Sequence, residues 1–314
     1  MFGELPKLFG KEFLVGYFLP AAIVIITAAI FASFSGALPV SNFAKKLFLD
    51  VDEKKLAVHL GVSVVIVWGL AIFLLVANFT LVRVLEGYGA LNPARLLRFW
   101  SLSIFEELNA KIKMLDSHKP LSASQQSERR RLRMRLSNEF PEHRRLVLPT
   151  RFGNIVRAFE RYPQVIYNID AIRCWTRLQA LLPDSYKTSL DAAKSILDFY
   201  INLWFGGLVL ASIAFGTLLT SSNPRMIIVG ISNVFLAMLS AKLAQGAAAQ
   251  WGELVKGAFD LYRGDLCKQL GFELPRSIEQ ERQMWAPICR TMIYRQSRYA
   301  DKFTTFRPLP DRKM

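Results

Sequence analysis

The sequence predicts an all-α integral membrane protein, and three observations point to that class. The chain of 314 residues combines a hydrophobic fraction of 52% with a formal net charge of +15. Its apolar residues gather in four long runs, and its basic residues gather between and after these runs. Membrane spans beside basic water-facing segments give this combination, which a single soluble domain seldom does. We therefore expect two transmembrane hairpins and a helical cytosolic domain.

Four apolar runs have the length that a bilayer requires, because a hydrocarbon core of roughly 30 Å takes about 20 helical residues. The runs cover residues 13–35, 58–82, 196–219 and 226–245. Pro20 lies in the first run, where it is expected to kink the helix without ending it. This run is too long for the apolar part of a cleaved signal peptide, so we expect it to be retained.

Basic residues set the expected orientation in the membrane. The segment 83–194 holds 20 Lys and Arg against 11 Asp and Glu, and the tail from Gln250 holds 12 against 8. Both segments are therefore expected on the cytoplasmic side of a bacterial inner membrane, together with both termini. The expected domains are a first hairpin over 1–84, a basic helical region over 85–195, a second hairpin over 196–249 and C-terminal cytosolic helices over 250–314.

Capping residues and prolines divide the water-facing parts into expected helices. Ser122 and Gln125 have the spacing of a capping box. Pro163 is expected to end one helix, and Pro287 is expected to separate the last two. The expected helices begin at Pro93, Ala123, Arg151, Tyr167 and Asp184, and the last of these runs without a break into the third span.

The helix expected from Pro93 carries an apolar stripe at three- and four-residue spacing. Arg95, Arg98, Lys111 and Lys113 lie around this stripe. Two interpretations stay open. The stripe packs into a cytosolic core, or the helix lies on the inner leaflet with its cations at the lipid headgroups. The stripe consists of Leu96, Leu97, Trp100, Ile104, Leu108, Ile112 and Leu115.

Arginines crowd the helix expected over 123–139 and the loop that follows it. They cover much of its circumference, so most of this helix is expected to be exposed. They could hold anionic lipid, bind a phosphate-rich ligand such as a nucleotide or nucleic acid, or bind a cytosolic protein partner. No aromatic side chain lies among them to stack bases. The candidate anion-binding residues are Arg129, Arg130, Arg131, Arg133, Arg135, Arg144 and Arg145.

Asp198 and Lys242 place opposite charges near the inner ends of the third and fourth spans. At about 1.5 Å per residue, Lys242 falls roughly 24 Å below Met226, close to the inner headgroups. A lysine at that depth can extend its ammonium group to the interface. The two residues form an ion pair within the membrane, or each marks the interface independently.

Small residues line one side of the fourth span and continue past it. Helices pack closely along such a seam, which either joins copies in a homo-oligomer or seals one helix bundle. The seam consists of Ala237, Ala241, Ala244, Ala248 and Gly252.

Weakly polar residues give the third and fourth spans a second face. In an oligomer of several copies around an axis, these residues could line a narrow, gated path for ions or water. The candidate pore-lining residues are Asn202, Thr217, Asn233 and Ser240.

The stretch from Leu148 to Pro183 resembles a broad family of uncharacterised bacterial multi-pass membrane proteins. The resemblance rests on the motifs LPTRFGN, YxID and WxRL and covers about a tenth of the chain. It implies a similar four-span layout and no particular activity. In layout alone, the chain is also similar to membrane effectors of bacterial anti-phage systems, which permeabilise the membrane when a nucleotide or nucleic-acid signal changes.

Enzyme motifs are missing from the sequence, including the P-loop, the zincin histidine pair and the esterase elbow. The three cysteines are far apart and predict neither a disulfide nor a zinc site. No catalytic residue, metal or cofactor is therefore expected. The first hypothesis is an oligomeric channel or pore-type effector whose basic region senses an anionic ligand. The alternatives are a non-conducting membrane scaffold that recruits a protein or nucleic acid, and an unrecognised membrane enzyme.

Overall fold

A computed structural model describes residues 10–34, 53–90, 92–117, 120–220, 223–295 and 306–307. Within these residues the chain is helical apart from turns and short connections, and no strand occurs in them. The chain divides into two compact units. We call residues 1–89 and 191–247 the span unit, and residues 90–190 and 248–314 the arginine-rich unit.

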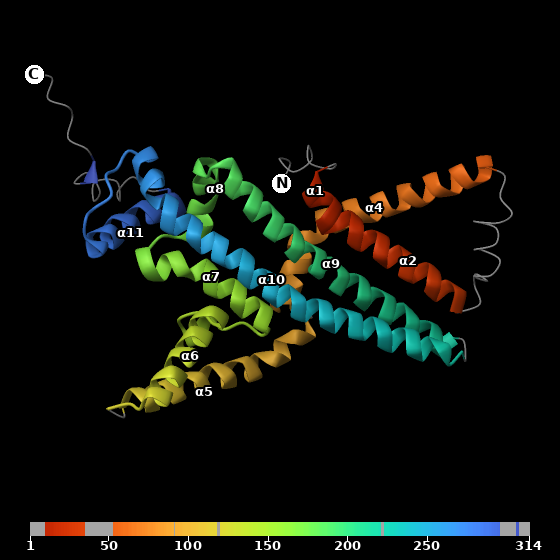
Figure 1. The fold of residues 1–314 in the computed structure, drawn as a ribbon, viewed down its shortest axis with the longest axis horizontal. Coiled ribbons are helices and arrows are strands. Elements are labelled where there is room, and N and C mark those ends of the chain that lie inside the picture. The colour runs from red at the N-terminus through yellow and green to blue at the C-terminus, as the bar shows by residue number, and fades with distance from the viewer. Residues whose placement is uncertain are drawn as a thin grey trace, which may run out of the picture. The chain divides into compact units, whose positions relative to one another are not determined.

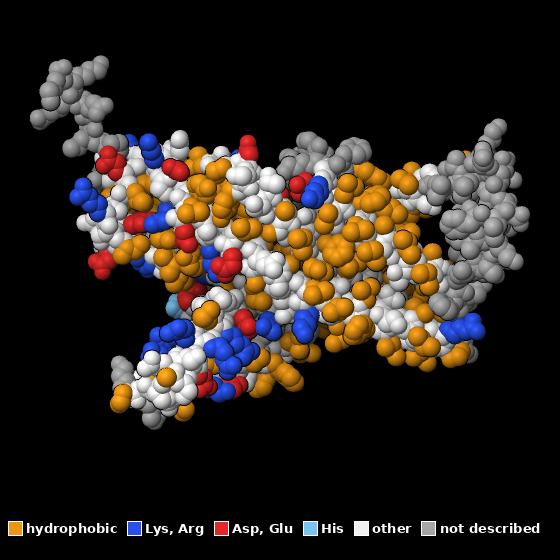
Figure 2. All heavy atoms as spheres, viewed as in Figure 1, with side chains coloured by type: hydrophobic (Ala, Val, Ile, Leu, Met, Phe, Trp, Pro, Cys, Tyr) orange, Lys and Arg blue, Asp and Glu red, His pale blue; other side chains and the backbone are white. Residues whose placement is uncertain are grey.

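Four helical segments of the structure are long and apolar enough to cross a membrane, as the sequence predicts for a membrane protein. The first span consists of α1, the π-helical turn η2 and α2, which follow one another without a break (Figure 1). Apolar side chains gather over these long helices (Figure 2). The elements are α1 (Lys11–Phe13), η2 (Leu14–Phe18), α2 (Leu19–Phe34), α4 (Glu53–Glu86), α9 (Asp184–Thr220) and α10 (Arg225–Gln269).

Glycines let α9 pack closely on two sides within the span unit. A side-chain carbon on Gly206 would collide with Val24 of α2. On the other side, a carbon on Gly207 would lie 3.0 Å from the backbone oxygen of Asn233 and 3.2 Å from Ala237. The third span is therefore held between the first and the fourth, and small residues set both distances.

The arginine-rich unit is built from shorter helices, and local capping explains where several of them begin. Asn92 caps η3, with Pro93 at the first helical position. Ser122 and Gln125 form the predicted capping box. The beginning of α9 and the end of α10 also belong to this unit. The elements are η3 (Pro93–Leu97), α5 (Arg98–Ser117), α6 (Ala123–Glu139), η4 (Arg144–Leu146), α7 (Arg151–Tyr167), α8 (Ala171–Leu181) and α11 (Ile278–Tyr294).

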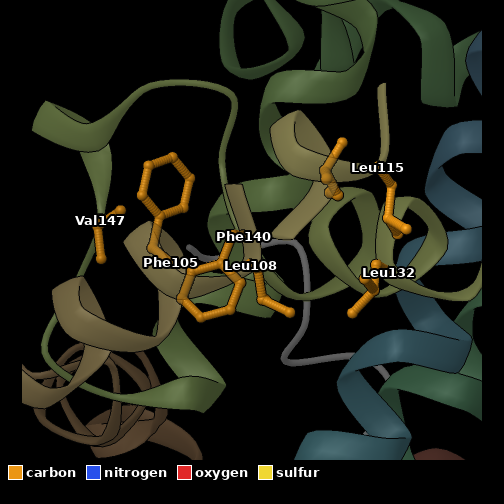
Figure 3. Packing of buried hydrophobic residues seen from close by; sticks show 7 residues of the cluster. Phe105, Leu108, Leu115, Leu132, Phe140 and Val147 are labelled. Carbon is orange, nitrogen blue, oxygen red and sulfur yellow. The ribbon is translucent and has the colours of Figure 1, made fainter. Parts of the chain in front are cut away.

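One hydrophobic core of the arginine-rich unit joins α5, α6 and the segment after α6. Figure 3 shows Phe105 and Leu108 of α5 beside Phe140, with Leu115 and Leu132 near one another further along the hairpin. These side chains are buried, together with Ile112 and Val147. Because Leu132 is the only buried residue of α6, most arginines of that helix are exposed to solvent.

Two prolines do not end helices as predicted. Pro163 lies inside α7, which continues to Tyr167, and Pro287 lies inside α11. A proline inside a helix removes one backbone hydrogen bond. Each helix nevertheless continues because it buries one face against the rest of the unit, and Pro163 itself is part of the buried face. The left-handed residue Asn168 ends α7 instead.

Candidate functional site: a buried polar cluster in the span unit

The site begins with a backbone defect in the first span. Pro20 has no N–H group, so it cannot donate to the carbonyl of Gly16, four residues earlier. The preceding turn widens into the π-helical segment η2, where Leu19 donates its N–H to Leu14. Such π-turns are frequent at functional sites. The Gly16 carbonyl is thus left without its usual partner from the helix.

Asn202 of α9 supplies the missing donor. Its Nδ2 lies 2.8 Å from the Gly16 oxygen, and its side chain is fully buried. In a bilayer, a carbonyl freed by proline needs a partner of this kind from a neighbouring helix. Asn202, which was predicted to line a pore, therefore satisfies the free carbonyl of the first span.

Asp198, one turn before Asn202, is the charged centre of the site. Only 4% of its surface is exposed. Its carboxylate accepts hydrogen bonds from Tyr17 Oη at 2.8 Å, Asn78 Nδ2 at 3.1 Å and Lys194 Nζ at 2.7 Å. The donors come from η2, α4 and α9, so one carboxylate connects three spans. We call Tyr17, Asn78, Lys194, Asp198 and Asn202 the Asp198 cluster.

The widened turn packs against α9 at Gly16. A side-chain carbon at Gly16 would lie 3.4 Å from the backbone oxygen of Ser195 and 3.5 Å from Cβ of Asp198. Without a side chain, the widened turn lies directly against α9. The defect and the cluster are therefore parts of one arrangement.

Two amide oxygens of the cluster are buried and have no hydrogen-bond partner, namely Oδ1 of Asn78 and Oδ1 of Asn202. An unpaired buried acceptor costs about 1–3 kcal/mol. A hollow of about 60 Å³ lies beside the cluster, lined in part by Tyr17, Lys194 and Asp198. This hollow is large enough to hold water. It offers the Asp198 carboxylate to a small polar guest, whereas Asn78 and Asn202 do not line it.

The structure gives Asp198 a different cation from the predicted one. Lys194 is its partner, four residues earlier on the same helix. Lys242 is exposed, and no ion pair joins it to Asp198 among the described residues. A pair at this spacing within one helix forms without any contact between helices.

The other predicted pore-lining residues lie mostly inside the subunit. Asn233 is 4% and Ser240 2% exposed. Asn233 Nδ2 donates to Val229 on its own helix, and its Oδ1 has no partner. Thr217 is half-buried and donates to Ala214. Asn233 and Ser240 are therefore covered within one chain, and their predicted place along a pore stays a prediction.

Other residues of the same chain cover most of the predicted oligomer seam. Ala237, Ala244 and Ala248 are 2% exposed or less. Ala237 faces Gly207, and a side-chain carbon on Gly252 would collide with the ring of Phe159. The seam seals helices of the subunit, and only Ala241 of the predicted set is half-buried.

The predicted anion-binding arginines separate into several groups. Arg129 and Arg133 both bond Asp116, which lies on α5. Their neighbour Arg130 forms no ion pair with any described residue. These three arginines line an open hollow of about 470 Å³ on α6 together with Gln126, Met134 and Ser137. The hydrogen bond from Arg133 lowers the pKa of Asp116 below its usual range.

The remaining predicted arginines lie outside this hollow. Arg135 bonds Glu139, and Arg144 bonds Glu106. Arg131 and Arg145 are exposed and make no ion pair within the described ranges. The adjacent residues Arg130 and Arg131 therefore differ in one respect, because only Arg130 faces the hollow. Lys and Arg side chains are prominent over α5 and α6 (Figure 2).

Asp260 organises a polar network in the arginine-rich unit that the sequence did not indicate. Its carboxylate accepts hydrogen bonds from Tyr162 at 3.1 Å and Tyr167 at 2.7 Å. Burial, followed by the hydrogen bond to Asp260, raises the pKa of Tyr167, which keeps this phenol protonated as a donor. Arg263 stacks on Tyr167 and pairs with the buried Glu281. The network fastens α7 and α11 to α10.

Cysteines that are far apart in sequence also meet in this unit. The sulfurs of Cys174 and Cys289 lie 3.9 Å apart, and both residues are buried as free thiols. The hydrogen bond with Cys289 and burial raise the pKa of the Cys174 thiol. Within the described ranges, no group of His, Cys, Asp and Glu could hold a metal ion.

Comparison of the chain with protein-family models, curated proteins and solved structures finds no match. The motif LPTRFGN leads into the first turn of α7, YxID covers the end of α7 and the connection to α8, and WxRL lies in α8. No activity is transferred from a relative. The function must be argued from the Asp198 cluster and the arginine hollow.

Proposed function

We propose that the chain is a channel-type membrane effector of the bacterial inner membrane. In this proposal, the Asp198 cluster controls the passage of an ion or a proton between the spans. The arginine-rich unit lies on the cytosolic side and senses an anionic ligand. The observation that carries the proposal is a carboxylate buried among three candidate spans, beside amide oxygens that have no partner.

The buried carboxylate is energetically costly. A charged residue inside a membrane is expensive and commonly marks an ion or proton pathway. Lys194 balances the charge of Asp198, but it does not fill the acceptors of Asn78 and Asn202. A purely structural cluster would be more stable with those acceptors satisfied or replaced by apolar groups. The Asp198 carboxylate beside a small hollow supports a polar guest such as water, a proton carrier or a small cation.

Regulation would pass through α9, which contributes residues to both units. Asp198 lies seven residues beyond the unit border at Asp191. A ligand shifts such an equilibrium only if it binds one conformation of the arginine-rich unit more tightly than another. The arginine hollow fits phosphate groups, because guanidinium groups match phosphate oxygens in geometry and charge.

The oligomer and the role in anti-phage defence belong to the same proposal. A homo-oligomer would form through faces other than the Ala237–Gly252 seam, which the subunit itself fills. A channel-type effector with a phosphate-sensing basic unit suits a response to nucleotide or nucleic-acid signals. The positive charge between and after the spans supports the cytosolic placement of this unit.

A non-conducting membrane scaffold is the second candidate. Close packing at Gly206 and Gly207 favours it, because these contacts seal α9 against both neighbouring spans. In a scaffold, the Asp198 cluster would only hold the spans together, and the arginine-rich unit would recruit a protein or nucleic-acid partner. The two candidates predict different ion fluxes.

Flux through proteoliposomes tests the proposal. The full chain is reconstituted with an entrapped potassium or pH indicator, and flux is recorded with and without inorganic polyphosphate as the anionic probe. We expect flux that changes when polyphosphate is added on the side of the arginine-rich unit. Protein that stays silent in both conditions would contradict the channel and favour the scaffold.

A matched pair of variants distinguishes a lost response to polyphosphate from poor reconstitution of the protein. Arg130→Gln changes an arginine of the hollow, whereas Arg131→Gln changes its exposed neighbour outside the hollow. We expect the polyphosphate response to weaken in Arg130→Gln and to persist in Arg131→Gln. Equal responses of both variants would remove the hollow from the mechanism.

A further inference from the structure

Four large apolar side chains are exposed at the beginning of the helical hairpin that α5 and α6 form. Leu96 is 82%, Phe99 76%, Trp100 71% and Leu97 50% exposed. They occupy η3 and the first turn of α5, within five consecutive residues. Single exposed apolar residues are ordinary, but a contiguous patch of this kind marks an interaction site.

The core of the same hairpin does not use this patch. Further along α5, Phe105, Leu108, Ile112 and Leu115 are buried in the core shown in Figure 3. Ser101 fixes the orientation of the first turns, because its Oγ donates to the Pro149 carbonyl at 2.8 Å. The stripe that the sequence predicts is thus split, with its second half in a core and its first half uncovered.

We propose that the segment Pro93–Trp100 lies in the headgroup region of the bilayer and binds anionic phospholipid. We call this segment the α5 anchor. This inference does not depend on ion passage, since a scaffold could be anchored in the same way. Three observations favour lipid as the occupant.

The first observation is the short connection to a candidate span. α4 ends at Glu86 and η3 begins at Pro93, with six residues between them. An extended chain of that length reaches no more than about 25 Å. If α4 crosses the membrane, the α5 anchor cannot lie far from the surface where that span ends.

The second observation is the composition of the α5 anchor. Trp is enriched where hydrocarbon meets headgroups, because its ring has an apolar body and a polar N–H. Leu96, Leu97 and Phe99 supply the apolar area that an interfacial helix inserts.

The third observation is charge. Arg95 and Arg98 are exposed and alternate with the apolar residues. Each cation near an anionic leaflet contributes roughly 1 kcal/mol of attraction. Phospholipid headgroups provide phosphates for these arginines at the depth where the apolar residues would insert.

Depth-dependent quenching tests the α5 anchor in the full chain. Cys174, Cys267 and Cys289 are buried, so a cysteine introduced at an exposed position can be labelled selectively. Trp100→Cys carries an environment-sensitive fluorophore in the anchor. Met114→Cys is the matched control, because Met114 lies on the same helix and is 60% exposed. Phe99→Cys replaces Trp100→Cys if that variant does not fold.

Both labelled proteins are reconstituted in vesicles that contain phosphatidylglycerol and lipids spin-labelled near the headgroup. We expect a blue-shifted emission at position 100 and the loss of most of its fluorescence to the spin label, with little quenching at position 114. An unquenched, water-like emission at position 100 would overturn the proposal. A blue-shifted but unquenched emission would also overturn it, because protein would then cover the patch.

The lipid class is tested by replacing phosphatidylglycerol with phosphatidylcholine. We expect quenching at position 100 to fall in the zwitterionic vesicles, and Arg95→Gln/Arg98→Gln to remove the difference between the two lipids. Quenching that is equal in both vesicles for the parent protein would contradict the role of anionic headgroups.

Discussion

The Asp198 cluster and the arginine hollow of α6 are both charged sites, but they differ in burial. Asp198 is 4% exposed and receives donors from three helical elements. Asp116, which pairs with two arginines of the hollow, is over a third exposed in its side chain. One site is enclosed by spans, and the other is open to ligands.

This difference in burial decides what each charge can do. Breaking a buried pair leaves an uncompensated charge and is strongly destabilising. An exposed ion pair contributes little to stability and is screened by salt. We therefore expect changes at the Asp198 cluster to alter folding and ion passage, and changes at the hollow to alter ligand binding alone.

The largest effect is expected for Asp198→Leu. This change removes the acceptor of Tyr17, Asn78 and Lys194. Each of the Tyr17 and Asn78 donors that loses its acceptor costs about 1–3 kcal/mol, whereas the Lys194 side chain is 44% exposed and can be hydrated. Thermal unfolding in detergent, followed by circular dichroism, should show a large fall in midpoint. Lys242→Leu is the control and should shift the midpoint little, because Lys242 is exposed; equal shifts would contradict the role of the buried Asp198 carboxylate.

Smaller effects on stability are expected at two glycines of α10, and the two alanine substitutions should act in opposite directions. Gly252→Ala places a carbon against the Phe159 ring and should destabilise by about 1–3 kcal/mol. At Gly246, no atom lies within 4 Å of the added carbon. Gly246→Ala should therefore stabilise the helix by roughly 0.5–1 kcal/mol. If both variants unfold like the parent protein, the seam is not packed as described.

At the arginine hollow, we expect changes in binding without changes in unfolding. Arg130→Gln should lower the affinity for polyphosphate and reduce the slope of log K against log salt by about 1, as for one lost phosphate contact. Arg131→Gln should leave the slope unchanged. Titrations at several salt concentrations measure both. An identical slope for the two variants would assign the binding to general surface charge.

The smallest effect is expected for Asp116→Asn. It frees Arg129 and Arg133 and should raise polyphosphate affinity by about twofold to fivefold, the scale of an exposed ion pair. Because the arginines lower the pKa of Asp116, its carboxylate stays charged at neutral pH. The ion pair is lost only as pH falls through this lowered pKa, below the ordinary value of 3.8. Titration of Asp116 should therefore not change the polyphosphate affinity between pH 6 and 8. A lower affinity of Asp116→Asn than of the parent protein would contradict the competition between Asp116 and polyphosphate for the arginines.

Local signals predicted much of the fold. Four apolar runs gave the four candidate spans, and Ser122 with Gln125 gave the observed capping box. The helix ends predicted at Pro163 and Pro287 are wrong, because packing of a buried helix face outweighed the hydrogen bond lost at each proline. The strength of that packing is a tertiary property and is not visible in a local pattern.

The candidate site could be predicted only in part. Asp198 and Asn202 were identified as polar residues in a span, and the spacing from Lys194 to Asp198 was also available as a local signal. Tyr17 and Asn78 were not, because their contacts with Asp198 bridge 181 and 120 residues. The small residues of α10 were predicted as a seam between copies or within one bundle, and that choice stays a prediction. Their partners, Gly207 and Phe159, depend on helix register.

Current recordings in planar bilayers test the central claim most directly, namely that ions pass at the Asp198 cluster. The parent protein and Asp198→Asn are compared in asymmetric potassium chloride. We predict discrete currents for the parent and a reversal potential shifted toward that of chloride for Asp198→Asn, because the variant removes a negative charge beside the ion path. A parent protein that stays silent with and without polyphosphate, or the same reversal potential in both proteins, would contradict the account.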